Sequence, residues 1–375
     1  MKTVMKTFAS LALAAILLAG CAKTPDEIKL GGVGPVTGEA ATFGDSTKKG
    51  LQLAVDEWNA KGGVLGKQIK LVFADDKGDP AEGATVYTKL IQQDKVVAIV
   101  GTVMSKVTLA GAPIAQAAKI PMISPTSTNE KVTQVGDYIY RACFIDPFQG
   151  TVGAKFAFND LGAKVAGVIF DVGNDYSKGL AENFKKSFEA LGGQVVAYEG
   201  HPTGTTDFKA QLTKILAGNP AALYCSDYYN DAALIAKQAR ELGYNGPIVG
   251  GDGFDSADFV KIGGTAVNNS FFTNHYAPDA TTPAVTAFVG GYKAKYGSTP
   301  DALAALAYDA GYIMVNAIKS AGKVDGESIK KALAATNLAA VSGQITFDAN
   351  RNPVKSAVII EIKDGKQVYR TTVNP

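Results

Sequence analysis

The stretch Ile28-Lys29-Leu30-Gly31-Gly32-Val33-Gly34-Pro35-Val36-Thr37-Gly38 decides the fold of this chain. Its apolar start predicts a buried strand over residues 28–33, and its glycine-rich end predicts a turn. A helix is expected next, from about Gly44 to Asn59, because Leu51, Val55 and Trp58 fall on one face. A strand that leads through a turn into an amphipathic helix is the opening unit of a parallel α/β sheet.

The same alternation continues along the chain. The first round places strands at 68–74, 96–100 and 121–124 and helices at 80–93 and 105–118. A second round starts near Pro147, with helices at 148–161, 177–191, 207–216 and 231–242 and strands at 165–170, 194–198, 221–224 and 248–250. The helix openings at 44–51 and 174–180 are similar in sequence. We therefore expect an α/β protein with two lobes, each a doubly wound parallel sheet.

The tail has a different order of elements. A strand at 268–273 precedes helices at 283–296, 301–320 and 328–335, and strands follow at 343–348, 356–362 and 367–372. Helices followed by a β-rich end suit a chain that returns to the first lobe and finishes in the second. The expected lobes, joined by a hinge, are 27–142 plus 274–343 and 143–273 plus 344–375.

The N-terminus indicates export. Lys2 and Lys6 precede the apolar run 8–18, which is too short to span a bilayer, and the small residues Ala19-Gly20 precede Cys21. This pattern resembles the lipobox of bacterial lipoproteins, which implies a signal peptide at 1–20 and a lipid on Cys21. The alternative is an ordinary signal peptide with an accidental cysteine. No later run approaches about 18 apolar residues, so we expect membrane contact through the anchor only.

Composition excludes several classes of function. The chain has 37 basic and 35 acidic residues, and removal of Lys2 and Lys6 leaves 35 of each, so we expect no nucleic-acid partner. Cys143 and Cys225 lie next to strand-like runs and are interpreted as buried apolar residues rather than a disulfide. His201 and His275 stand apart from any cysteine, so we expect no metal and no other cofactor.

Three motifs, in order along the chain, resemble one family. They are Gly34-Pro35-Val36-Thr37-Gly38 with Phe43-Gly44-Asp45, then Pro121-Met122-Ile123-Ser124-Pro125-Thr126-Ser127-Thr128, then Arg141-Ala142-Cys143-Phe144-Ile145-Asp146-Pro147-Phe148-Gln149-Gly150. Together, from about Ile28 to the C-terminus, they resemble the branched-chain amino-acid binding proteins of ABC importers, which have the type I periplasmic binding fold. The resemblance implies a monomer that is not an enzyme, closes on its ligand between two lobes and delivers it to permease subunits.

The first lobe supplies donors in this interpretation. Ser105 is expected to start a helix after strand 96–100, where its hydroxyl and the free N–H groups suit a carboxylate. It matches the family's serine with that role; the alternative is a plain N-cap. By resemblance, the carbonyl of Thr126 and the hydroxyl and N–H of Thr128 face the zwitterion, and Thr126 and Ser127 narrow the pocket. These residues could instead cap a turn.

The second lobe supplies the acid. Asp252 follows strand 248–250 and matches the family's acidic residue that pairs with the ligand ammonium, although the best-known relatives have glutamate there. The alternative is a turn aspartate between glycines. Phe43, Tyr176 and Tyr228 match aromatic positions that wall the cleft, and each could instead fill a core.

Two rival functions fit parts of the sequence. Gly32, Gly34 and Gly38 with Asp75-Asp76 superficially resemble a dinucleotide site, but the spacing is GxGxxxG and Pro35 removes an N–H. The other rival keeps the fold and makes the protein a sensor or receptor for amides, aromatic acids or another small solute. An acid placed for an ammonium favours an α-amino acid over such solutes.

Overall fold

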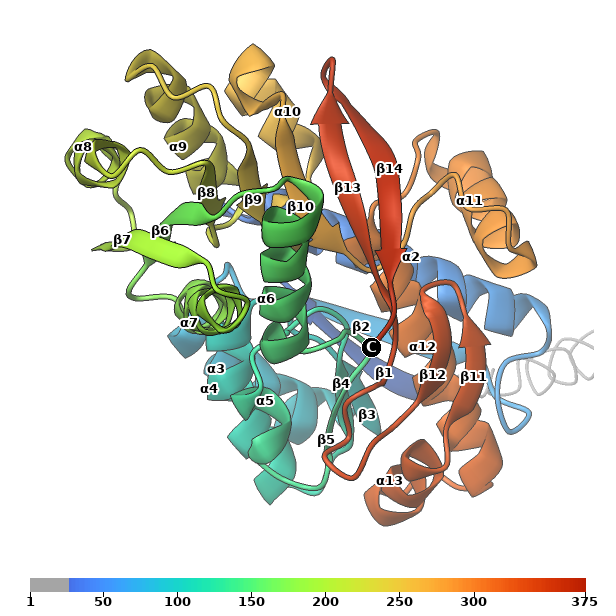
Figure 1. Cartoon of the computed structure of the whole chain (residues 1–375). Coiled ribbons are helices and arrows are strands. Elements are labelled where there is room, and N and C mark those ends of the chain that lie inside the picture. Colours follow the sequence, from blue (N-terminus) through green and yellow to red (C-terminus); the bar gives the residue numbers. More distant parts are fainter. Residues whose placement is uncertain (1–26) are drawn as a thin grey trace, which may run out of the picture.

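The computed structural model describes residues 27–375, so the predicted signal peptide and Cys21 lie outside the described residues. Two separate sheets carry the fold, each with helices packed against it (Figure 1). The predicted two-lobed α/β architecture is therefore confirmed. Within residues 27–375, no helix is long and apolar enough to cross a membrane.

The first sheet is parallel throughout. Its strands lie in the order β2 (Ile69–Asp75), β1 (Ile28–Gly34), β3 (Ala98–Val100), β4 (Met122–Ser124) and β5 (Ile139–Arg141). The helices that follow these strands are α2 (Ala41–Ala60), α3 (Pro80–Lys89), α4 (Ser105–Ala117) and α5 (Lys131–Gln134), with a π-helical turn, Leu90–Asp94, after α3. Helix α2 begins three residues earlier than predicted, so Phe43 lies in its first turn.

The second sheet is mixed. Its parallel part contains β7 (Gln194–His201), β6 (Val165–Asp171), β8 (Ala222–Cys225), β9 (Ile248–Gly250) and β10 (Ser270–Asn274), and β13 (Ala357–Lys363) and β14 (Lys366–Val373) extend it as an antiparallel hairpin. Its helices are α6 (Asp146–Lys155), continued by a π-helical turn at Phe156–Asp160, α7 (Asp175–Ala190), α8 (Lys209–Ala217), α9 (Tyr229–Glu241) and α10 (Ala257–Gly263). Short 3₁₀ turns, Asp252–Phe254 and Gly264–Val267, flank α10.

The predicted tail helices return to the first lobe. They are α11 (Pro283–Tyr296), α12 (Ala302–Ala321) and α13 (Gly326–Ala334), followed by the small hairpin of β11 (Asn337–Ala340) and β12 (Gly343–Thr346). Helix α12 packs closely on α2, since a Cβ on Gly50 would come within 2.0 Å of the Ala304 carbonyl oxygen. Thus the two ends of the first lobe's sequence share one core.

The chain after β12 keeps its contacts with the first lobe, while the expected lobe boundary lies at 343. Ile345 is buried in the core of the first sheet, and the Phe347 ring lies 5.0 Å from that of Tyr140. Arg351 donates to the carbonyl oxygen of Ile139 at 3.1 Å. Apolar burial therefore keeps this segment on the first lobe, and we propose that the passage to the second lobe begins at Pro353.

Candidate ligand-binding site

A small cavity lies between the two lobes, where strands of both sheets end. Its lining includes six of the predicted site residues: Phe43, Ser105, Thr126, Tyr176, Tyr228 and Asp252. The remaining lining residues are Val103, Gly253, Asn274, His275, Ala302, Leu303 and Leu306. Residues of both lobes therefore line one cavity.

Ser105 is the first residue of α4, and the N-cap position belongs to Met104. The expected alternative of a plain serine N-cap is therefore wrong. Instead, the Ser105 hydroxyl accepts from the backbone N–H of Asn129 at 3.3 Å. The serine thus lies at a helix N-terminus that faces the cavity, where N–H groups without a carbonyl partner in the preceding turn favour an anion.

The three hydroxyl residues after β4 have different environments. Thr126 lines the cavity, and its hydroxyl donates to the Val103 carbonyl at 3.1 Å. Ser127 does not line the cavity, because its hydroxyl bonds to that of Thr108 at 2.6 Å and to the Val103 carbonyl at 2.9 Å. Thr128 is also outside the cavity lining, and its hydroxyl is buried. Among these three, only Thr126 contributes directly to the cavity wall.

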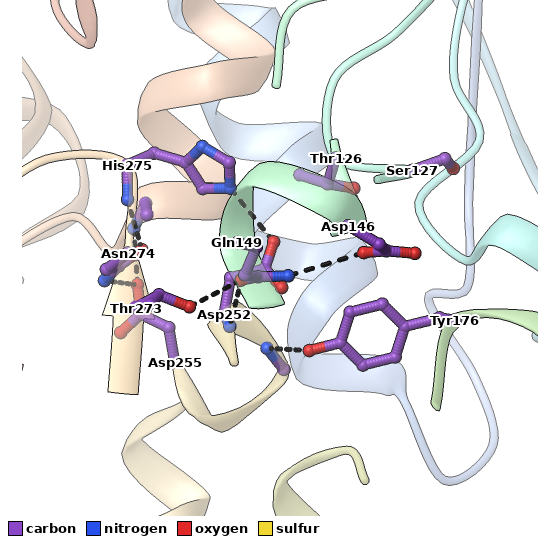
Figure 2. Close-up of polar contacts among 12 residues, drawn as sticks. Thr126, Ser127, Asp146, Gln149, Tyr176, Asp252, Asp255, Thr273, Asn274 and His275 are labelled. Carbon is purple, nitrogen blue, oxygen red and sulfur yellow. Dashed lines mark hydrogen bonds and ion pairs between the residues drawn. The ribbon is translucent and has the colours of Figure 1, made fainter. Parts of the chain in front are cut away.

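Asp252 projects from the turn after β9 into the cavity, as Figure 2 shows. Its backbone N–H donates to Gln149 Oε1 at 2.9 Å, and its Oδ2 atom lies 2.9 Å from His275 Nε2. The Oδ1 atom is buried without a hydrogen-bond partner. Within residues 27–375, Asp252 has no lysine or arginine within ion-pair distance. No basic side chain among these residues therefore competes with a ligand cation for this carboxylate.

Aromatic rings from both lobes close the cavity. Tyr176 and Tyr228 stack with their ring centroids 4.9 Å apart, and Phe43 of the first lobe meets Tyr228 edge-on at 5.6 Å. The Tyr176 hydroxyl accepts from the Gly253 N–H at 3.0 Å, which ties the stack to the turn that carries Asp252. Phe43 and Tyr176 are buried, so in this structure the rings both wall the cavity and fill the lobe interface.

Several cavity features were missed at the level of sequence. The sequence predicts an isolated His275, whereas its Nε2 atom lies 2.9 Å from Asp252 Oδ2. Leu303 and Leu306 come from α12, and with Val103 they form an apolar wall beside the polar groups. Their spacing is that of one helix face, but no sequence signal indicates that this face reaches the cleft.

A second buried acid, Asp146, lies near the site (Figure 2). It is the first residue of α6, and its Oδ1 atom accepts from Gln149 Nε2 at 3.5 Å. Burial, together with the like charge of Asp252, raises the pKa of Asp146 to about 8. Gln149 thus connects the two acids, because its Oε1 atom also accepts from Asp252 N–H and from the Thr273 hydroxyl at 2.7 Å. The sequence predicts a helix that begins at Phe148, so it does not place Asp146 on the same helix as Gln149.

Direct contacts join the lobes around the cavity. Asn129 Nδ2 donates to the Asp175 carbonyl at 2.7 Å, and the Tyr229 hydroxyl donates to the Glu39 carbonyl at 2.7 Å. The Thr42 and Ser256 hydroxyls are 3.1 Å apart. The structure is therefore a closed form, in which residues far apart in sequence seal the cleft.

The superficial dinucleotide motif has a structural explanation. Asp75 accepts from the N–H groups of Val36 and Lys77, each at 2.9 Å, so its carboxylate stabilises the turn after β1. Asp76 is buried and accepts from Gly78 N–H at 2.9 Å. Because both carboxylates accept hydrogen bonds from backbone N–H groups of nearby turns, neither is free to bind a ribose.

The fold and the cavity together define a two-lobed protein that encloses a small solute between its sheets. The chain belongs to the periplasmic binding protein family, which it matches over residues 27–367. It therefore has the type I periplasmic binding fold, and the family implies a location outside the cytoplasm.

Several known proteins are similar to this chain over nearly its whole length. A leucine-binding protein from Thermotoga maritima is 42% identical, with a TM-score of 0.89, and the match covers 93% of this chain and 99% of that one. A branched-chain amino acid transporter substrate-binding protein from Streptococcus pneumoniae, solved with isoleucine, is 38% identical, with a TM-score of 0.89 and coverage of 93% and 100%. A leucine-, isoleucine-, valine-, threonine- and alanine-binding protein from Pseudomonas aeruginosa is 30% identical, covering 92% of this chain and 91% of its own length.

Proposed function

We propose that this protein captures a branched-chain aliphatic amino acid between its lobes and delivers it to an ABC importer. The observation that carries the proposal is the chemistry of one cavity. A helix N-terminus at Ser105, an unpaired carboxylate oxygen of Asp252 and the apolar side chains of Leu303 and Leu306 all line it. These groups match the carboxylate, ammonium and aliphatic side chain of one zwitterion. The names of the relatives support the same ligand class.

The proposed binding sequence starts on the first lobe. Ser105 and the N-terminus of α4 take the ligand carboxylate, the Thr126 carbonyl accepts from the ammonium, and Thr128 offers its hydroxyl and N–H to the zwitterion. The second lobe then closes and brings Asp252 and the ring of Tyr228 onto the ligand. Because the ligand is satisfied from both sides only in the closed form, binding shifts the population toward that form, which the permease would recognise.

Phe43, Tyr176 and Ser127 have more limited roles in this proposal. Phe43 and Tyr176 supply apolar contact area from opposite lobes. Ser127 acts through the backbone, since its hydroxyl fixes the loop that carries Thr126. We further propose that the protein needs no cofactor and catalyses no reaction.

Calorimetry on the purified protein tests the ligand. Leucine, isoleucine and valine should bind at one site per chain, and each should raise the melting temperature in proportion to ln(1 + [L]/Kd). Benzoate and an aliphatic amide serve as controls for the sensor alternative. Binding of benzoate with no response to any of the twenty amino acids would overturn the proposal.

We also propose that the chain is exported, cleaved before Cys21 and held at the membrane by a lipid on that cysteine. Expression in a bacterium should place the protein in the membrane fraction, and Cys21→Ser should release it to the soluble fraction. Size-exclusion chromatography of that soluble form should give a monomer. A Cys21→Ser variant that remains with the membranes would contradict the anchor.

A further inference from the structure

The two carboxylate oxygens of Asp252 differ in their surroundings. The Oδ2 atom lies 2.9 Å from the Nε2 atom of His275, whereas Oδ1 is buried without a hydrogen-bond partner. The side chain is 11% exposed, so rotation of the carboxylate would exchange these atoms in a largely water-free space. The direction of the unpartnered Oδ1 atom therefore depends on what fixes the Oδ2 atom.

His275 is itself held firmly. Its ring stacks on Phe144 with centroids 3.8 Å apart and an interplanar angle of 22°. Its backbone N–H donates to Asn274 Oδ1 at 2.8 Å, and Asn274 Nδ2 donates to Asp255 at 2.9 Å. Phe144 follows β5 of the first sheet and His275 follows β10 of the second, so segments that leave both sheets set the position of the imidazole.

The imidazole is neutral in this environment. Burial lowers the pKa of His275 to about 4, and the contact with Asp252 opposes that effect only in part. Nδ1 is buried without a hydrogen-bond partner, which suits an unprotonated nitrogen and places the single N–H on Nε2, toward Asp252. A neutral donor orients the carboxylate without cancelling its charge.

We propose that His275 is a positioning residue that fixes Oδ2 of Asp252 so that Oδ1 faces the ammonium of the bound amino acid. The inference rests on the proposed function and adds to it a residue that sets the site's preference for an α-amine. It also explains how an aspartate can act at this position, because the histidine bond directs the short carboxylate into the cavity.

A double-mutant cycle with leucine calorimetry tests the role. His275→Phe keeps a ring against Phe144 but removes the donor, and it should weaken leucine binding at least about 10-fold, the lower end of the effect of one lost hydrogen bond to a charged group. His275→Gln restores a donor and should recover affinity to within about 3-fold of wild type. In an Asp252→Asn background, His275→Phe should add less than about a 2-fold loss, because the charge that it positions is gone.

The other histidine provides the control. His201 is buried in the second lobe and does not line the cavity, so His201→Gln should leave leucine affinity unchanged. Wild-type affinity in His275→Phe, or losses that simply add in the double variant, would overturn the inference. If instead wild type itself fails to bind leucine, the proposed function fails first, and the two failures are distinguishable.

Nitrogen NMR on the wild-type protein gives an answer even if the variants do not fold. The chain has two histidines, so His201→Gln assigns both signals. We expect His275 as the neutral Nε2–H tautomer at pH 7, with an N–H proton signal that shifts when leucine is added. A neutral Nδ1–H tautomer or a charged ring would refute the proposed geometry.

Discussion

Asp252→Asn is the substitution that bears most directly on the site. It preserves the shape of the side chain and removes the negative charge beside the ligand ammonium. In the structure, Oδ1 is buried and unpartnered, and no lysine or arginine among residues 27–375 pairs with the carboxylate. A bound ammonium would therefore lose its one anionic partner in a poorly hydrated site.

The magnitude follows from that geometry. A hydrogen bond to a charged group contributes about 1.5–3 kcal/mol, and the side chain is only 11% exposed, which places the loss near the upper end. We therefore expect leucine affinity to fall about 100-fold, since about 1.4 kcal/mol corresponds to a factor of ten. The melting temperature of the ligand-free protein should not fall, because removal of a buried, unpaired charge does not destabilise the fold.

Isothermal titration calorimetry with leucine measures the effect. Asp364→Asn is the matched control, because Asp364 is an exposed acid in the turn between β13 and β14 of the same lobe. It should bind leucine like wild type. Equal affinity in Asp252→Asn and Asp364→Asn would refute the reasoning, since the ammonium would then have another partner.

Three further predictions concern the fold around the site. Burial alone would lower the pKa of His201, but Asp227, 3.3 Å away, outweighs that effect and raises the pKa to about 9. The stability that this contact contributes should be present below about pH 6.5 and lost as the pH rises through about 9. The difference in unfolding free energy between wild type and His201→Gln, measured by urea titration, should therefore shrink over that range. A difference that grows with pH would contradict this sign. Cys143 and Cys225 are free and buried, and burial raises the pKa of Cys143 to about 12. A thiol reagent at pH 8 should therefore label both cysteines only after denaturant is added. Rapid labelling of the native protein would contradict the burial of these two thiols. Gly50→Ala should lower the unfolding free energy by about 1–3 kcal/mol, because the new methyl group would meet the Ala304 carbonyl of α12, whereas Gly290→Ala, with open space around it, should not.

The sequence by itself determined the alternation of strands and helices and the lobes that follow from it. Buried parallel strands are short apolar runs, and helices repeat their apolar residues every three or four positions, so both signals are local. The same locality indicated Ser105 and Asp252, since each directly follows a strand whose end must lie at the ligand-binding edge of its sheet.

Only the tertiary structure decided which groups meet at the cavity. The bond between His275 and Asp252, and the wall formed by Leu303, depend on where the chain returns after the second lobe, and no local pattern encodes that return. Side-chain direction in the loop after β4 was equally undetermined: Ser127 turns toward Thr108, while Thr126 stays at the cavity. Sequence periodicity reports the environment of each element, whereas contacts between distant elements depend on how whole layers pack.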